Sequence, residues 1–476
     1  MPIKRRAVLT GAAAAPVGSA YGGARIVMND ASRLNPTPVM KHWQPGVDQT
    51  GEWIAELRSE LRDAARDGRR VAVGAARHSM GGQSLPRDGL AITLEEPWFE
   101  PDTANGVYRV SAGARWSEII GWLDPIGFSP KVMQSNNDFG VASTFSVNAH
   151  GWPVPYGPFG STVRSIRMKL SDGSVVECSR THEPELFSLA MGGYGLFGVI
   201  LNLDIEMTLN VLLRARAVRM PAEQFAERFI AAIERDPSVR MAYGRMSVAR
   251  ASFFSEAIMT TYHPEPVQPA ELPWAVSGGS MTSISNMVYR QQIGSETYKR
   301  LRWVAEAKLA PGVSSGLATR NSLMNEPVSN LANTDRRRTD ILHEYFVPPD
   351  RFGDFLLACR EVIPPARAEF INVTLRYIGA GDIASMSFAP GPRIAAVMSF
   401  SQEITTEGEI DMLQTTEALI DRILAIGGAF YLPYRLHARR DQVTRAYPKT
   451  AAFIERKRFY DPGLLFRNAM WDAYFA

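Results

Sequence analysis

The sequence predicts an α+β fold made of two domains. Its 476 residues exceed the usual size of one domain, so two domains are the default expectation. The character of the chain changes after Met207, and a long amphipathic segment follows at residues 221–235. Beyond that point the predicted helices and strands do not alternate strictly, which is typical of α+β packing.

The composition excludes several classes of protein. The 52 basic and 49 acidic side chains leave a net charge of +3, so charge does not favour nucleic acid or anionic lipid as a partner. Cys178 and Cys359 are too few for a disulfide framework or a cysteine-rich metal site. We expect two buried thiols, with a single bridge as the alternative, and no metal site. No stretch is long and apolar enough to span a membrane.

The first 28 residues have the order of an export signal. Lys4-Arg5-Arg6 precedes an alanine-rich run that ends at Ala15, and Gly18-Ser19-Ala20 supplies small residues for cleavage. The arginine pair indicates the twin-arginine route, and hence a periplasmic or exported protein. An unprocessed N-terminus on a cytoplasmic protein is the alternative.

Hydrophobic periodicity sets out the first domain, residues 29–208. It begins with an irregular, proline-rich lead-in at 29–47. The pattern then predicts helices at 52–66 and 116–123, and strands at 71–73, 90–94, 107–113, 166–170, 175–178 and 199–205. The strands at 166–170 and 175–178 flank a Ser-Asp-Gly-Ser turn and therefore form a hairpin.

The stretch VAVGAARHSMGGQ, residues 71–83, combines a short strand with a turn of small residues around His78. Successive backbone N–H groups in such a turn form a concavity that suits a pyrophosphate. The stretch lacks the Gly-Lys-Ser/Thr of a P-loop and the spacing of a dinucleotide fingerprint. Alone, it could equally be a glycine-rich surface turn with a chance histidine.

A second stretch, FGVASTFSVNAHG at 139–151, is rich in hydroxyl groups. Ser143, Thr144, Ser146 and Asn148 can each donate a hydrogen bond to a phosphate or a ring carbonyl, and alternation would place them on one face of an extended segment. Farther on, Gly192-Gly193-Tyr194-Gly195 precedes a strand and not a helix, which excludes a Rossmann loop.

These motifs, in this order, resemble the FAD-binding domain of the vanillyl-alcohol oxidase and p-cresol methylhydroxylase family. The resemblance covers roughly residues 45–207 and 458–476. It implies a two-domain FAD-linked oxidase fold, with FAD bonded covalently through His78; residues 139–151 contain no cysteine for a second bond. The further cofactor residues that it implies are Gly74, Ala75, Ala76, Arg77, Ser79, Met80, Gly81, Gln83, Ser143, Thr144, Ser146, Asn148, Gly151, Val199, Ile200 and Asn468.

Residues 209–440 stand where this family has its substrate-binding cap domain. Periodicity predicts helices at 221–235, 295–309, 351–363 and 415–426, and strands at 341–347, 370–378 and 393–402. Residues 441–476 then return to the FAD domain. Within them, FYDPGLLFRN at 459–468 resembles the C-terminal segment of the aldonolactone and alditol oxidase branch.

That branch carries a Glu-x-Arg facing the flavin on a cap-domain strand. Here Arg376 matches the arginine, and Thr374 stands in place of the glutamate. Arg435 and His437, in YLPYRLHA at 431–438, are the other candidate catalytic residues, since an arginine stabilises an alkoxide and a histidine accepts a proton near neutral pH. The resemblance implies oxidation of a CH–OH group in a sugar lactone or polyol, with oxygen or another acceptor reoxidising the flavin.

Two other functions stay open. RHSMGGQ also resembles the His-Ser-x-x-Gly-Gln turn of cytokinin dehydrogenases, which oxidise a secondary amine. The chain could also carry a flavin without turning over any substrate.

Overall fold

The structure, a computed structural model, describes residues 26–49, 51–276, 289–313, 316–328, 333 and 335–476. The predicted export signal therefore lies outside the described residues up to position 25. The last three residues of the predicted signal are described and form β1 (Ile26–Met28), which pairs with β2 (Thr37–Val39).

A small parallel sheet holds the first part of the chain. Its strand order is β3-β5-β4, and the strands are β3 (Lys41–Trp43), β5 (Leu90–Ile92) and β4 (Val71–Val73). Helix α1 (Glu52–Arg66) matches its predicted bounds and buries Trp53, Leu57 and Leu61, because these residues recur at helical spacing. The lead-in at 29–47, predicted to be irregular, instead contains β2 and β3.

A second, antiparallel sheet follows with the order β10-β9-β11-β7-β6, and β8 also pairs with β11. Its strands are β6 (Phe99–Asp102), β7 (Val107–Ser111), β8 (Phe128–Pro130), β9 (Val163–Lys169), β10 (Val175–Ser179) and β11 (Val199–Leu209). Helices α2 (Trp116–Leu123) and α4 (Pro184–Ala190) accompany it. The β9–β10 hairpin and the strand after Gly195 confirm two predictions, including the exclusion of a Rossmann loop.

Residues 139–148 are not extended, so this prediction is wrong. They contain the short helix α3 (Val141–Ser146), because Val141 and Phe145, four positions apart, both enter the core.

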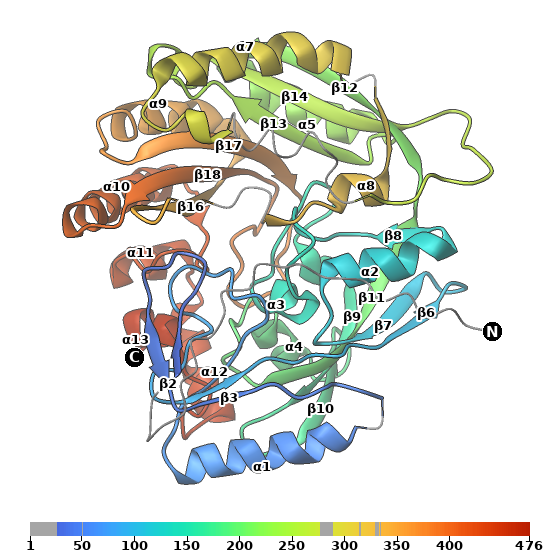
Figure 1. Cartoon of the computed structure of the whole chain (residues 1–476), viewed down its shortest axis with the longest axis vertical. Coiled ribbons are helices and arrows are strands. Elements are labelled where there is room, and N and C mark those ends of the chain that lie inside the picture. The colour runs from blue at the N-terminus through green and yellow to red at the C-terminus, as the bar shows by residue number, and fades with distance from the viewer. Residues whose placement is uncertain (1–25, 50, 277–288, 314–315, 329–332, 334) are drawn as a thin grey trace.

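An eight-stranded antiparallel sheet forms the upper half of the molecule (Figure 1). Its strands, in spatial order, are β15 (Leu317–Thr319), β12 (Leu212–Pro221), β14 (Glu256–Pro264), β13 (Met241–Met246), β17 (Glu369–Ile378), β18 (Arg393–Glu403), β16 (Arg338–Val347) and β19 (Ala429–Phe430). The helices of this half are α5 (Phe225–Arg235), α7 (Glu296–Val313), α8 (Arg320–Met324), α9 (Phe352–Val362) and α10 (Thr406–Ala425). Helix α10 contacts β16, β18 and α9.

Helix α10 begins nine residues before its predicted start at residue 415. Thr405 caps it by accepting a hydrogen bond from the Gly408 backbone N–H, and the N-terminal turns present mostly polar side chains that hide the helical period.

The chain ends in the lower half of the molecule with α11 (Arg440–Ala446), α12 (Thr450–Tyr460) and α13 (Ala469–Tyr474) (Figure 1). Between α12 and α13 the backbone runs parallel to β4, since the Val71 N–H donates to Leu465 and the Arg467 N–H donates to Val71. The last segment therefore adds an edge to the sheet that leads into the His78 turn. The predicted α+β fold is confirmed.

Candidate active site

One large cavity separates the two halves of the molecule and encloses about 1500 Å³, its open mouth included. One wall comes from the turn after β4, the segment around α3 and the loop before β11. The opposite wall comes from β16, β17, β18 and residues 431–434. The cavity therefore brings residues from both halves of the chain to one space.

The turn after β4 presents a row of unused donors to the cavity. The backbone N–H groups of residues 75–79 donate no hydrogen bond within the described part of the chain, and all five residues line the cavity. Arg77 holds the turn in a left-handed conformation, with φ of 53°. Five free N–H groups in succession are what a pyrophosphate requires, because its oxygens are acceptors only.

The following residues of the turn are used to anchor it. The Met80 N–H donates to Pro433, and the Gly81 N–H donates to the side chain of Gln83, whose amide in turn binds the carbonyl of Leu432. Met80 and Gly81, predicted as cofactor residues, do not line the cavity, whereas Gln83 does.

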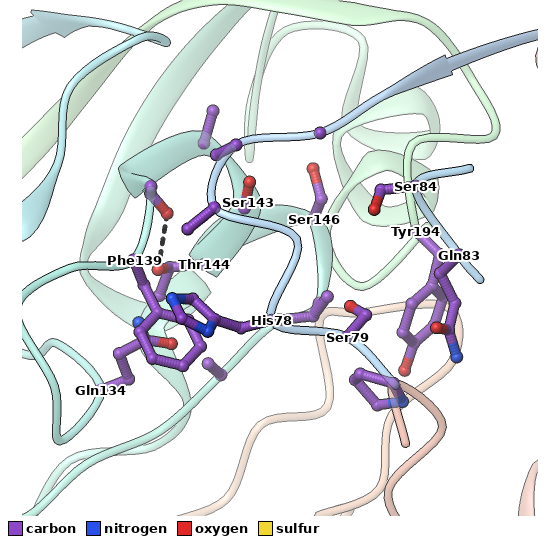
Figure 2. Close-up of a pocket in the computed structure, with 18 of the residues that line it drawn as sticks. His78, Ser79, Gln83, Ser84, Gln134, Phe139, Ser143, Thr144, Ser146 and Tyr194 are labelled. Carbon is purple, nitrogen blue, oxygen red and sulfur yellow. Dashed lines mark hydrogen bonds between the residues drawn. The ribbon is translucent and has the colours of Figure 1, made fainter. Parts of the chain in front are cut away.

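His78 lies against Phe139, with ring centroids 4.1 Å apart, as Figure 2 shows. Its Nε2 is 3.6 Å from a carboxylate oxygen of Asp138. Burial lowers the pKa of His78; the Asp138 charge opposes this shift, and the Arg115 charge adds to it. The imidazole is therefore neutral at pH 7, the state in which a ring nitrogen can form a covalent bond to carbon.

The predicted hydroxyl residues divide into two groups. Ser143, Thr144 and Ser146 line the cavity beside the turn (Figure 2), although the Thr144 hydroxyl already binds Gly140 and the indole of Trp116. Asn148 does not line it, because its side chain accepts a hydrogen bond from the Gly160 backbone.

Four other predicted cofactor residues, Ile200, Val199, Gly151 and Asn468, lie at different distances from the cavity. Ile200 lines the cavity, but Val199 is fully buried elsewhere in β11. A β-carbon on Gly151 would lie 1.9 Å from the carbonyl oxygen of Met133, so this glycine permits a close backbone approach, and it does not line the cavity. Asn468 reaches the cavity only indirectly, through a 3.1 Å bond to the carbonyl of Tyr194.

Of the three predicted catalytic residues, only Arg376 lines the cavity. Arg435 and His437 both bind Glu409 of α10, outside the cavity. Burial tends to raise the pKa of Glu409, but the bond from His437 and the Arg435 charge outweigh it and hold the pKa at about 2.

Sequence reasoning missed or undervalued the polar groups beside Arg376. His150 and Glu344 are buried, are hydrogen-bonded to each other through His150 Nε2, and line the cavity with Tyr431 and Tyr434. Burial lowers the pKa of Arg376, while the Glu344 charge acts in the opposite sense. His150 closes the second hydroxyl-rich stretch, and Glu344 alternates with the buried residues of β16; these were the available signals.

The cavity has the polar groups that FAD needs. Buried side-chain atoms without a hydrogen-bond partner among the described residues include Arg77 Nε, Ser84 Oγ, Ser135 Oγ, His150 Nδ1 and Arg376 Nε, and all five residues line this cavity. Such atoms are costly unless a ligand or water binds them. Within the same described ranges, no group of three metal-ligating side chains meets, and no helix is long and apolar enough to cross a bilayer.

Comparisons with known proteins agree with this geometry. Residues 51–179 match the family model described as an FAD binding domain. An uncharacterized oxidoreductase from the fasciation locus of Rhodococcoides fascians is 29% identical over 35% of this chain and 38% of its own length. Cytokinin dehydrogenase 8 of Oryza sativa subsp. indica is 30% identical over 33% of this chain and 32% of its own. A putative D-arabinono-1,4-lactone oxidase of Neurospora crassa is 26% identical over 31% of this chain and 27% of its own length.

The chain thus spans roughly a third of the length of the curated relatives that it matches. The predicted resemblance to an FAD-binding domain is confirmed.

Proposed function

We propose that this protein is an FAD-dependent oxidoreductase that oxidises a CH–OH group of a small hydroxylated substrate, a sugar lactone or polyol. The observation that carries the proposal is one cavity with two different walls. The turn at residues 75–79 offers five free N–H groups to a pyrophosphate, and Arg376 enters from the opposite side. Oxygen or another acceptor reoxidises the flavin.

When bound, FAD would supply the two-electron acceptor for a hydride. The chain supplies binding and orientation. Residues 75–79 hold the diphosphate, Ser143 and Ser146 offer hydroxyl groups beside it, and Ile200 packs against the bound cofactor. On the substrate side, the Arg376 guanidinium stabilises negative charge on the reacting oxygen, and its burial strengthens that interaction by excluding water.

The substrate class is tested by anaerobic bleaching of the flavin absorbance with lactones, alditols, secondary alcohols and amines. Bleaching by lactones or alditols supports the proposal. The second candidate is amine oxidation, favoured by the similarity to a cytokinin dehydrogenase. Bleaching by cytokinins alone would establish it instead, and a flavin that nothing bleaches would indicate a carrier.

Arg376→Ala should slow flavin reduction by a working substrate roughly 10²–10³-fold, the usual cost of losing one oxyanion donor. Rapid-mixing absorbance at 450 nm measures this rate. Arg393→Ala, on the neighbouring strand and outside the cavity lining, is the control. An unchanged rate in Arg376→Ala would remove this residue from the reaction.

We also propose that the flavin is bonded covalently to His78. The neutral imidazole, its stacking on Phe139 and its place in the pyrophosphate turn support this. Flavin should then remain with the wild-type polypeptide after acid precipitation, whereas His78→Ala should release it and still bind FAD in the native state. Flavin that washes out of the precipitated wild type would contradict the bond.

Export by the twin-arginine route is a separate proposal, supported by the residues at 4–20 alone. Replacing Arg5 and Arg6 with lysine should retain the protein in the cytoplasm. A mature wild-type chain that keeps its first residues in a cytoplasmic fraction would refute it.

A further inference from the structure

His150 lies at the point where the hydroxyl-rich stretch meets the eight-stranded sheet. Only 4% of the residue is exposed, and its Nε2 is bonded to Glu344 of β16. Glu344 also accepts a hydrogen bond of 3.2 Å from the Tyr434 hydroxyl. The other ring nitrogen, Nδ1, is buried and has no hydrogen-bond partner among the described residues, yet His150 lines the cavity.

The strand register explains why Glu344 faces the cavity. Thr374 on β17 pairs with Val397 on β18, and Val397 pairs with Glu344 on β16. Residues paired in this way point to the same face of a sheet. The carboxylate that is missing at Thr374 is therefore supplied two strands away, about 10 Å across the same face at the usual spacing of strands.

The Glu344 bond determines the role of each imidazole nitrogen. A neutral imidazole has one N–H donor and one acceptor nitrogen. An ionised Glu344 carboxylate only accepts hydrogen bonds, so in a neutral imidazole bound to it the proton would lie on Nε2 and Nδ1 would keep its lone pair. An acid that orients a histidine through one nitrogen leaves the other free as a base, the logic of the serine-protease triad.

Aromatic side chains surround the His150 ring and shield it from water, which suits a general base. Aromatic rings of Phe346, Phe388 and Tyr431 lie 5.7, 6.2 and 6.4 Å from the His150 centroid. Arg376 Nη1 donates to the His150 carbonyl at 3.4 Å, which places the guanidinium beside the same residue. A proton acceptor and an oxyanion donor thus adjoin one another on the cavity wall.

We propose that His150 is the general base of the reaction and that Glu344 is the residue that positions it. The inference rests on the proposed function. The substrate O–H bond breaks and its proton passes to Nδ1 of His150. The C–H bond breaks with its electron pair, which leaves as a hydride for oxidised FAD, and the C=O bond forms. The substrate loses two electrons, and Glu344 stabilises the resulting imidazolium.

The test uses the full-length, FAD-loaded protein and the alcohols and lactones of the bleaching panel. His150→Gln should slow flavin reduction roughly 10²–10⁴-fold, the range for loss of a general base. Glu344→Gln should cost a similar factor, because the amide can donate to Nε2 and so favours the wrong tautomer. Glu344→Asp, which keeps the carboxylate, should recover part of the rate.

His343→Gln is the matched control. His343 is the neighbour of Glu344 on β16, is equally buried, and binds Tyr345 and Thr416 on the far side of the strand. It does not line the large cavity, so its rate should stay within a few-fold of wild type. Equal rates in wild type and His150→Gln would overturn the inference.

A second readout needs no substrate. Protonation of a base in the cavity favours reduced flavin, so the midpoint potential of bound FAD, measured against redox dyes, should show a break with pH. The charged or titratable groups facing His150 are Glu344, Arg376, Tyr431 and Tyr434. The pH dependence of the potential should change in His150→Gln and stay as in wild type in His343→Gln.

The two readouts separate the two claims. If no alcohol or lactone reduces the wild-type flavin, the proposed function fails, and the reaction step assigned to His150 fails with it. A pH dependence of the potential that is the same in His150→Gln as in wild type overturns the inference even when alcohols are oxidised. Should His150→Gln not fold as a yellow protein, Glu344→Asp provides the decision, since a merely structural carboxylate would leave the pH dependence of flavin reduction unchanged.

Discussion

Replacing Asp461 with asparagine should destabilise the C-terminal return and loosen the cofactor turn. Asp461 and Lys457 form an ion pair in which the side chains are 2% and 0% exposed. The Asp461 carboxylate also accepts the backbone N–H groups of Leu465 and Phe466, at 3.0 and 2.8 Å. These bonds set the path of the residues that extend the sheet beside β4.

The expected cost follows from burial. Asparagine keeps the size of the side chain but leaves the Lys457 ammonium without a charge partner in the interior. Breaking one side of a buried pair costs about 3–5 kcal/mol. The unfolding entropy of a chain of 476 residues is on the order of 1 kcal/mol per kelvin, so Asp461→Asn should lower Tm by about 3–5 °C.

Thermal unfolding followed by flavin and tryptophan fluorescence measures both effects, and the change in flavin fluorescence that marks opening of the cofactor turn should come at a lower temperature in Asp461→Asn. The matched control is Asp472→Asn in the same segment. Asp472 pairs with Arg70 and Arg467, but its side chain is 33% exposed, so the loss should stay below about 1 kcal/mol. Equal shifts in both variants would refute the argument from burial.

Two further predictions concern the cavity and its surroundings. Gly140→Ala, made in the His78→Ala background so that FAD is held without a covalent bond, should weaken FAD retention at least several-fold in equilibrium dialysis, because its β-carbon would lie 2.5 Å from that of Ala75 and displace the turn. Glu409→Gln should lower stability by roughly 1–2 kcal/mol at pH 7, after discounting the shift from 4.5 to about 2 for partial exposure. Because the folded pKa is depressed, this contribution is complete above about pH 4.5 and is lost as pH falls towards 2, which urea unfolding at several pH values measures.

Controls make both predictions specific. Gly121→Ala, on α2 with open space around the new methyl group, should leave FAD retention unchanged. Glu403→Gln, at the exposed end of β18, should differ little from wild type in its free energy of unfolding at every pH tested. A Glu409→Gln variant as stable as wild type at pH 7, or an unchanged retention in Gly140→Ala, would contradict the respective argument.

Local patterns in the sequence were sufficient for most of the fold. Helix α1 and β4 formed where apolar spacing placed them, and glycine-containing turns located the β9–β10 hairpin. The patterns failed where tertiary contacts decide. Residues 141–146 have too few apolar side chains for their spacing to predict a helix. Helix α10 begins with a polar turn, and its start depends on the cap at Thr405.

The sequence located more of the cavity lining on the cofactor side than on the substrate side, where Arg376 alone of the three predicted catalytic residues lines the cavity. The turn at 75–79 carries its donors on consecutive residues, so its function is visible locally. The substrate side depends on long-range register. Alternation assigns Glu344 to one face of β16 but cannot say which face lines the cavity, and that becomes clear only from its alignment with Thr374 across β18. Arg435 had an unforeseen partner in Glu409, which lies in the part of α10 that was not predicted.

The contact between β4 and the C-terminal segment also has a consequence for biosynthesis. Val71 and Leu465 are 394 positions apart (465 minus 71), and a ribosome adding about 5–20 residues per second needs roughly 20–80 s to make that length. During this interval the edge of β4 has no partner from Leu465 or Arg467, and an unpaired strand edge invites association with other chains. The cofactor turn that follows β4 therefore gains its full support only after the last residues of the chain have been made.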